Sequence, residues 1–291
     1  MMRRIALTLV LSLLLIACGT DPASDTASQP VALMAEPVPF EPTESGRPPL
    51  SALAAEQIVH RGNAEEPQTL DPHLAQGVPA ATILRDLFEG LVTTEPGGRI
   101  VPGSAAHWDI SRDGLVYTFY IDQDSRWSNG EPLTAHDFVW SWKRVVNPAT
   151  GASSARMLAP VSNAEAILAG EMTVDALGVA ALSESSFQVT LESPTPYFLG
   201  LLTHPTTYPV HRPSLEAYGA AHVRPGQLVS NGAYSLSDWQ VRAFIELVRN
   251  PHYRLADEVI VERVMYYPFD DEGTEFNRFR AGDLHWTYQV P

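Results

Sequence analysis

The residues in this sequence that could do chemistry are a few carboxylates and histidines, and their spacing does not favour catalysis. Paired carboxylates occur at Glu65-Glu66 and Asp270-Asp271, but both pairs lie in polar stretches that read as solvated turns. His136 and Asp137 are neighbours in a segment with helical spacing, where adjacent side chains point to different faces. We therefore do not expect them to act as a proton-transfer pair.

Sequence motifs of hydrolases and metal sites are also missing. The nearest match to a Gly-x-Ser-x-Gly nucleophile motif is "GASSA" at 151–155, which fails at its last position, and no His-Glu-x-x-His occurs. His204 and His211 have two prolines between them, which is a poor spacing for a metal site. We expect no catalytic residue, no bound metal and no cofactor.

The first eighteen residues predict export from the cytoplasm. Met1–Arg4 is a short basic head, and Ile5–Ala17 is an unbroken apolar run. A helix of that length spans about 20 Å, less than the roughly 30 Å of a bilayer core, so it fits a secretory signal better than a spanning anchor.

The end of this signal carries a more specific feature. Leu15-Ile16-Ala17-Cys18 resembles the lipobox of bacterial lipoproteins, whose cysteine receives a diacylglycerol and becomes the new N-terminus. The resemblance implies that residues 1–18 are removed as a signal peptide and that Cys18 is lipidated. The alternative is an ordinary signal peptide with an incidental cysteine. The residue after Cys18 is glycine rather than aspartate, which favours the outer membrane in a cell with two membranes.

Composition narrows the class of protein further. Cys18 is the only cysteine, so no disulfide is expected, and the fold must depend on buried apolar area. The net charge of −15 repels phosphate backbones, which argues against nucleic acid as a partner. No interior run is long and apolar enough to predict a membrane span.

The composition of the sequence changes near Gln57. Residues 19–56 are rich in Pro, Ala, Ser and Thr without a sustained period, and we expect a disordered tether. From Gln57 onward, short strands and helices alternate without a repeat, so α/β or α+β is the class. The expected elements are helices at Ala80–Leu91 and Glu272–Ala281, a hairpin around Asp113-Gly114, and strands at Phe187–Leu191, Ala233–Leu236, Phe244–Arg249, Val259–Tyr267 and Leu284–Tyr288.

Three of the six tryptophans lie in "WSNGEPLTAHDFVWSWKRV", residues 127–145. Thr134 and Asp137 form a capping-box pattern, and Pro148 ends the helix that this pattern begins. Trp142 lies on the apolar stripe of that helix, and we expect it in the core. Trp127 is expected to cover the helix entry. Trp140 faces the other side, either exposed or packed under a loop.

The segment "RDLFEGLVTTEPGGRIVPGSAAHWDISRDGLVYTFYIDQDSRWSNGEPLTAHDFVWSWKRVVNP" resembles the signature of extracytoplasmic solute-binding proteins that serve ABC importers of oligopeptides. Further matching pieces are "EPQTLDPHLAQGVP" (66–79), "PTPYFLGLLTHPTTYPV" (194–210), "SNGAYSLSDW" (230–239) and "FNRFRAGDLHW" (276–286). Together they cover about Gln57 to Pro291. The oligopeptide branch of this family, the peptide- and nickel-binding family 5, is the most similar.

This resemblance implies an α/β fold of the periplasmic-binding-protein-like type II (cluster C), in which two lobes close on an extended peptide. The protein pairs with the peptide main chain, which suits a receptor for many sequences. Its pairing segment corresponds to Gln76, Gly77 and Val78. His204, Tyr288 and Gln289 correspond to residues at the cleft, with hinge packing as the alternative role for His204. A position where some relatives carry a tyrosine near the ligand corresponds to Ser154.

The resemblance also implies the domain order. Residues 57–88 and 205–291 correspond to lobe I, and 89–204 correspond to a subdomain inserted into it. Relatives continue into a second lobe where this chain stops at Pro291, so we expect that lobe to be missing and peptide affinity to be weak.

The expected function is therefore a lipid-anchored, monomeric periplasmic receptor that passes oligopeptides to an ABC permease in the membrane. The alternatives are a degenerate envelope lipoprotein with an interaction role only and, less favoured, a periplasmic hydrolase.

Overall fold

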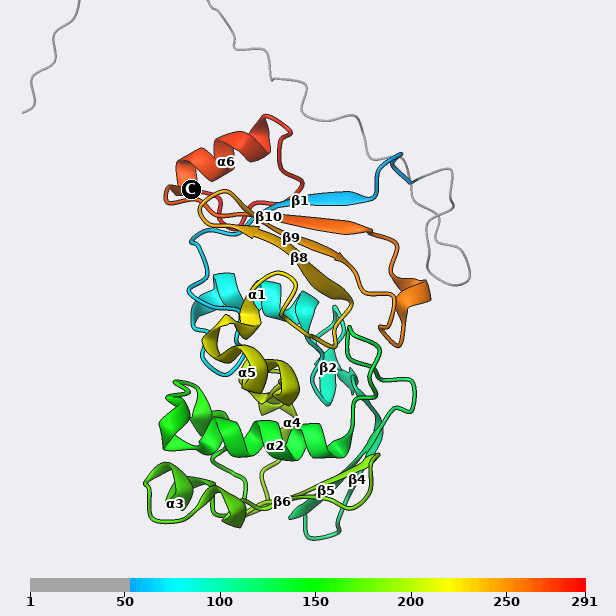
Figure 1. Cartoon of the computed structure of the whole chain (residues 1–291), viewed down its shortest axis with the longest axis vertical. Coiled ribbons are helices and arrows are strands. Elements are labelled where there is room, and N and C mark those ends of the chain that lie inside the picture. The colour runs from blue at the N-terminus through cyan, green and yellow to red at the C-terminus, as the bar shows by residue number, and fades with distance from the viewer. Residues whose placement is uncertain (1–52) are drawn as a thin grey trace, which may run out of the picture. The chain divides into compact units, whose positions relative to one another are not determined.

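The computed structural model describes residues 53–291, and two four-stranded sheets organise them (Figure 1). The predicted signal peptide, Cys18 and nearly all of the 19–56 tether lie outside these residues. No helix within 53–291 is long and apolar enough to cross a membrane.

The first sheet joins the beginning and the end of the described chain. Its strand order is β1-β10-β9-β8, formed by Ile58–Gly62, Arg263–Tyr267, Phe244–Arg249 and Tyr234–Gln240. β1 pairs with β10 in parallel, and the other pairs are antiparallel. β9 has the predicted bounds, whereas β8 and β10 begin later than predicted.

The second sheet is antiparallel throughout, in the order β4-β5-β7-β6, formed by Ala105–Ile110, Val116–Ile121, Ser186–Thr190 and Val179–Ala181. The hairpin predicted at Asp113-Gly114 joins β4 to β5, with Gly114 at φ 71°. Burial alternates along β5, so Tyr117, Phe119 and Ile121 face the core.

The helix with the tryptophans, α2 (Ala135–Val146), covers the buried face of this sheet. Its capping box at Thr134 and Asp137 is present as predicted. Trp142 is fully buried and donates from Nε1 to the Thr207 carbonyl oxygen at 2.9 Å. Trp127 is buried too, and its ring meets His211 edge-on. Trp140 is half-buried, with the guanidinium of Arg212 5.9 Å from its ring centre.

The predicted helix at Ala80–Leu91 is wrong at both ends, because α1 is Gly77–Leu87. It begins earlier because Pro79 fits the first turn, where no intrahelical N–H bond is lost. It ends before Phe88, whose backbone is extended. Leu91 is still buried in the core, but it lies outside the helix. A short hairpin follows, made of β2 (Val92–Thr94) and β3 (Ile100–Pro102).

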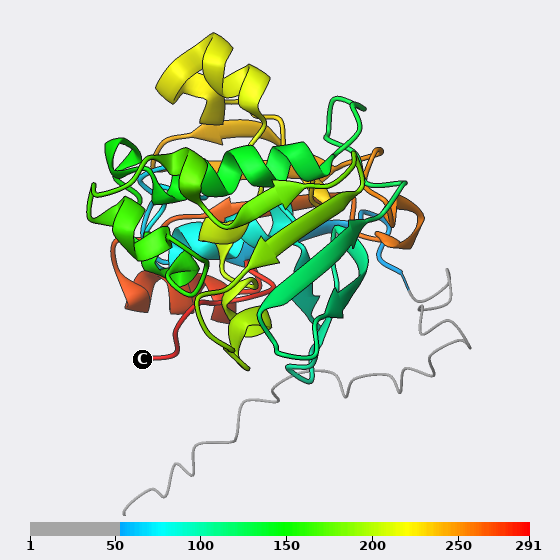
Figure 2. The same ribbon diagram turned by 90° about the horizontal axis from the view of Figure 1, so that it is seen from below.

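The remaining helices are short. They comprise α-helices α3 (Ala164–Leu168), α4 (Phe198–Leu201), α5 (Arg212–Tyr218) and α6 (Glu272–Arg280), and 3₁₀ turns at Pro148–Thr150, Ala155–Leu158, Val174–Ala176, Pro205–Thr207, Gly219–Val223 and Ala256–Glu258. Figure 1 shows α1 between the first sheet and α2, and α6 beyond the first sheet on the other side, while Figure 2 shows α2 and the second sheet in front. The buried apolar side chains of both sheets belong to one connected cluster. The predicted division into 57–88 with 205–291 and 89–204 stays a prediction.

A buried ion pair links the loop before α1 to α2. Both oxygens of Asp71 accept hydrogen bonds from Arg144, at 3.0 and 2.6 Å, and the Asp71 side chain is 2% exposed. Burial alone would raise the pKa of Asp71, but the hydrogen bonds and charge of Arg144 outweigh it and hold that pKa below its usual value. Asp71 therefore stays ionised, and it fixes the loop by also accepting from the backbone N–H of His73.

His73 completes this network as a neutral ring. Its Nδ1 lies 2.7 Å from the Arg144 guanidinium, which can only donate, so Nδ1 accepts. Its Nε2 therefore carries the proton and donates to the Tyr208 carbonyl oxygen at 3.0 Å. Burial lowers the pKa of His73 to about 4. The positive charge of Arg144 beside the ring also opposes its protonation.

This arrangement predicts loss of stability in mild acid. The pKa of His73 is lower in the folded than in the unfolded state, so its contribution is complete above pH 6.5 and is lost as the pH falls toward 4. Between pH 7.5 and pH 5 the free energy of unfolding should fall by about 2 kcal/mol from this group. Urea denaturation at the two pH values measures it.

His73→Gln should shrink this difference, because glutamine can still donate to Tyr208 but does not titrate. His107→Gln, which changes an exposed histidine, should leave the difference unchanged. An equal pH difference in wild type and His73→Gln would contradict the assignment.

Candidate functional site

The predicted main-chain binding segment lies at the exposed start of α1. Gln76, Gly77 and Val78 are all exposed, Val78 to 51%. Gln76 is extended, and Gly77 has φ 80°, which a residue with a side chain adopts only under strain. The sequence suggested a strand here, whereas Gly77 and Val78 form the first turn of a helix.

That first turn leaves backbone donors free. The first N–H groups of a helix have no intrahelical partner, and Gln76 does not cap them with its side chain. Within 53–291, the amides of Gly77 and Val78 have no other hydrogen-bond acceptor. No acidic residue lies in the first turn. The segment therefore offers two adjacent N–H groups to a guest that carries carbonyl oxygens.

A pocket of about 250 Å³ lies on one side of this segment, and we call it the Gly77 pocket. It brings Gln76 and Gly77 together with His204 and with Ser154, which are distant in the sequence. The lining residues are Pro72, Ala75, Gln76, Gly77, Ala81, Leu84, Ser153, Ser154, His204 and Pro205. Its walls are small or polar, so they restrict the shape of a guest side chain very little.

His204 is held in one neutral form at the edge of this pocket. Its Nδ1 accepts from the backbone N–H of Thr206 at 3.2 Å, so the proton lies on Nε2. Burial lowers the pKa of His204, and the positive charge of Arg85 lowers it further. The ring is therefore a neutral hydrogen-bond donor at pH 7.

A second pocket, of about 270 Å³, includes Pro79 from the first turn of α1 in its lining, and we call it the Tyr288 pocket. Tyr288 and Gln289 line it, so the predicted site residues divide between two pockets, and Val78 lines neither. The remaining lining residues are Ala64, Glu65, Pro79, Phe269, Asp270, Glu272 and Glu275.

The predicted final strand, Leu284 to Tyr288 or Gln289, is wrong. Only a single bridge forms, between Arg61 and Trp286, with the Gly62 N–H donating to the Trp286 carbonyl oxygen at 2.9 Å. Beyond it the chain leaves the sheet, because a side chain takes over its backbone bonds.

That side chain is Glu275, which sequence reasoning missed. It is 3% exposed and accepts hydrogen bonds from the Ala64 N–H at 3.1 Å, the Thr287 hydroxyl at 3.0 Å and the Tyr288 N–H. Gly62 makes room for it, since a Cβ there would lie 2.2 Å from its Oε1. In the sequence, Glu275 is one of several acidic residues near α6, and nothing local distinguishes it.

Within residues 53–291, no group of three or more His, Cys, Asp or Glu side chains is arranged to hold a metal ion. The arrangement offers free backbone donors next to residues that line two polar pockets, which suits binding of an extended, amide-containing molecule.

Comparison with known proteins gives one family. Residues 99–291 match the family described as bacterial extracellular solute-binding proteins, family 5 middle. The chain is 41% identical over 238 residues to the periplasmic oligopeptide-binding protein OppA of Salmonella typhimurium, covering 81% of this chain and 44% of that protein. It is 39% identical to the probable deoxycholate-binding periplasmic protein YgiS of Escherichia coli, covering 84% of this chain and 47% of that protein.

The solved structure of Haemophilus influenzae OppA in complex with the peptide RPPGFSPFR has the same fold over the shared part. The TM-score is 0.80 at 38% identity, covering 82% of this chain and 47% of that one. The fold is therefore that of the type II periplasmic binding proteins, as the sequence indicated. The chain spans under half the length of the relatives it matches.

The geometry around Glu275 gives a second prediction. Glu275→Ala should free the amides of Ala64 and Tyr288 and lower the free energy of unfolding by about 1–2 kcal/mol, because it removes the acceptor that these two partly buried amides share. Hydrogen–deuterium exchange should show both amides exchanging at least about tenfold faster. Glu272→Ala, an exposed change on the same helix, is the matched control. Unchanged protection of Tyr288 in Glu275→Ala would exclude this positioning role.

Proposed function

The chain belongs to family 5 of the bacterial extracellular solute-binding proteins, a family of binding proteins rather than enzymes, and we propose that it captures oligopeptides in extended form for an ABC importer. Its matched relative from Salmonella typhimurium is named as an oligopeptide-binding protein. A solved relative holds a nine-residue peptide. We propose that this chain supplies one wall of such a peptide site.

The observation that carries this proposal is the pair of free amides at Gly77 and Val78, with Gly77 in the lining of one pocket and Pro79 in the lining of the other. Peptide carbonyl oxygens occur in every sequence, so donors of this kind bind a main chain without regard to side chains. The Gly77 pocket and the Tyr288 pocket would take up side chains on either side. Gln76, His204, Tyr288 and Gln289 are the proposed polar contacts.

The polar, open lining of both pockets supports a site that tolerates guest side chains of different shape. Neither pocket is enclosed by apolar side chains, and water can fill the space beside a small guest residue. A guest held by two backbone bonds on one wall alone gains little free energy, since each such bond contributes about 0.5–1.5 kcal/mol. The proposed affinity of this chain by itself is accordingly weak.

We also propose that the protein works in the periplasm as a monomer, anchored by a lipid on Cys18 and in contact with a membrane permease. The relatives are named as periplasmic proteins. Support for the anchor comes from the sequence before Cys18.

One observation favours a different class of ligand, the bile acids. The relative at 39% identity is named as a probable deoxycholate-binding protein, and deoxycholate is an amphipathic anion without a peptide backbone. It therefore serves as the competing ligand in the test of the peptide proposal.

Nuclear magnetic resonance titration of the full chain, in a nonionic detergent, tests the proposal with tri-alanine as the probe. The amides of Gly77 and Val78 should shift first, with a dissociation constant of about 1 mM or weaker, as expected for so few bonds. Val78→Pro removes one donor at a helix position that tolerates proline and should weaken binding about two- to tenfold. Val78→Ala keeps the N–H and is the control.

Equal affinity of the proline and alanine variants would rule out main-chain binding at Val78. Shifts at these amides with deoxycholate but not with tri-alanine would replace the peptide proposal by a bile-acid one.

The anchor is tested separately in the cell envelope. In a bacterial host that processes lipoproteins, the wild-type chain should incorporate radiolabelled palmitate and sediment with membranes. Cys18→Ser should lose the label and be released into the soluble periplasmic fraction, since it lacks the sulfur that carries the lipid. Membrane association that survives Cys18→Ser would contradict lipid anchoring.

A further inference from the structure

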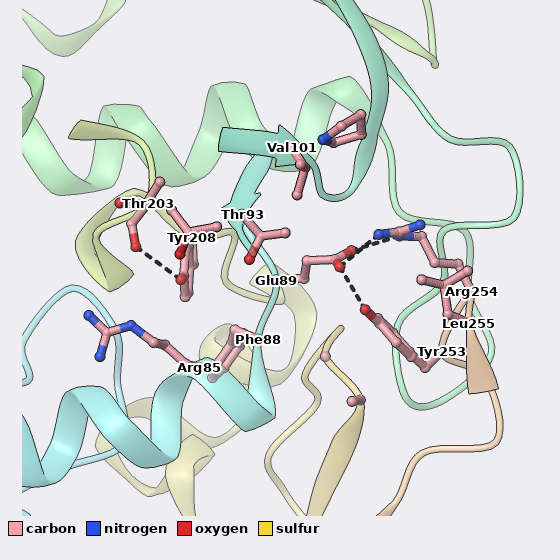
Figure 3. Close-up of a pocket in the computed structure, with 15 residues that line it drawn as sticks. Arg85, Phe88, Glu89, Thr93, Val101, Thr203, Tyr208, Tyr253, Arg254 and Leu255 are labelled. Carbon is pink, nitrogen blue, oxygen red and sulfur yellow. Dashed lines mark hydrogen bonds and ion pairs between the residues drawn. The ribbon is translucent and has the colours of Figure 1, made fainter. Parts of the chain in front are cut away.

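A cavity of about 340 Å³ lies beside Glu89, and no residue lining it lines the Gly77 pocket or the Tyr288 pocket (Figure 3). The end of α1, the β2–β3 hairpin and the loops that carry Thr203 and Arg254 enclose it. Its volume is at the lower end of the range typical of small-molecule pockets. It is therefore a separate space with a size of its own.

At one end of this cavity, the negative charge of Glu89 is compensated by an arginine of the protein. Glu89 accepts from Arg254 Nε at 2.9 Å and Nη2 at 3.0 Å, and from the Tyr253 hydroxyl at 2.7 Å. The residue is only 8% exposed. Since Arg254 compensates the charge of Glu89 and its oxygens are already bonded, this carboxylate is not available to hold a cationic ligand.

The opposite end carries a positive charge without a compensating carboxylate. Figure 3 shows Arg85 across the cavity from the Glu89–Arg254 pair, below Thr203 and Tyr208. Among residues 53–291, no Asp or Glu oxygen lies within 4.0 Å of its guanidinium. Its one hydrogen bond is a long one of 3.4 Å, to the Ala81 carbonyl oxygen in its own helix. Arg85 is an exposed residue at the mouth of this space, and most of its donors have no partner within residues 53–291.

The walls between these ends combine hydroxyls with apolar surface. Thr93 and Thr203 supply hydroxyl groups and Phe88 supplies apolar contact, while Leu255 lies beside Arg254 at the other end (Figure 3). Burial raises the pKa of Tyr208 to about 12, so its hydroxyl is neutral and donates to the Thr203 carbonyl oxygen at 3.1 Å. No negative charge of Tyr208 opposes an anion beside Arg85.

We propose that this cavity binds a small organic anion, in which a carboxylate bonds to Arg85 and a short apolar body lies against Phe88. A guanidinium presents paired N–H groups that match the two oxygens of a carboxylate. A volume of about 340 Å³ admits a ligand the size of one aromatic acid and excludes a peptide of several residues. This site is independent of the peptide site, so the two proposals are tested separately.

Benzoate is a suitable probe, because it joins one carboxylate to one apolar ring, and benzamide is its neutral counterpart. Chemical shifts of Arg85, Thr93 and Phe88 in the full chain should saturate with benzoate at millimolar concentrations in low salt. Benzamide should bind at least about tenfold more weakly, since it lacks the charge that Arg85 recognises. Tri-alanine should leave these resonances unmoved.

Arg85→Gln should weaken benzoate binding at least about fivefold, and Arg85→Lys should retain part of it because the positive charge remains. Arg112→Gln removes an exposed arginine on the β4–β5 hairpin and should have no effect. Thermal unfolding of each variant without ligand checks that the fold is unchanged.

Three results would overturn the proposal. They are no saturable shift with benzoate, equal loss of binding in Arg85→Gln and Arg112→Gln, and equal affinity for benzoate and benzamide. If inorganic phosphate displaced benzoate at an equal concentration, an apolar body would not be needed for binding, and that part of the proposal would be excluded.

Discussion

The Asp71–Arg144 ion pair is the interaction on which the candidate site depends. Asp71 is almost inaccessible to water, and a lone charge there would be strongly destabilising. Arg144 lies on α2 and reaches this loop with two hydrogen bonds, so α2 and the segment before α1 keep one relative position. Because the backbone N–H groups of Leu74 and Ala75 donate to the Asp71 carbonyl oxygen, the path of the chain into Gln76 is fixed as well. The exposed amides therefore stand on a rigid base.

Glu89 and Glu275 follow the same rule at two other junctions. Each is a buried carboxylate with donors from two separate segments, and Gly62 leaves room for Glu275. A buried polar group of this kind adds little net stability, but a shifted register would leave it unpaired at a cost of several kcal/mol. These carboxylates select one arrangement of the chain rather than strengthen it.

The sequence predicted those elements that depend on residues close together in the chain. The capping box of α2, the apolar stripe with Trp142, the turn at Asp113-Gly114 and the bounds of β9 all depend on residues a few positions apart. The start of α1 and the end of the chain depend instead on distant partners, such as Glu275 for Tyr288. The site could be indicated only through family resemblance, because free backbone amides at Gly77 and Val78 leave no mark in side-chain types. No pattern pointed to Arg85 or Glu89.

The parallel pairing of β1 with β10 has a consequence for how the protein is made. β1 emerges early from the ribosome or translocon, yet its partner, Arg263–Tyr267, emerges near the end of the described chain. The antiparallel sheet of β4 to β7 consists of residues that emerge between them, and its hairpins close over short loops that fold quickly. Throughout that interval β1 has an unpaired edge, which is the kind of segment that aggregates or recruits chaperones. Arg61, which stands between His60 and Gly62 in this strand, places a charge on that unpaired edge and so protects it.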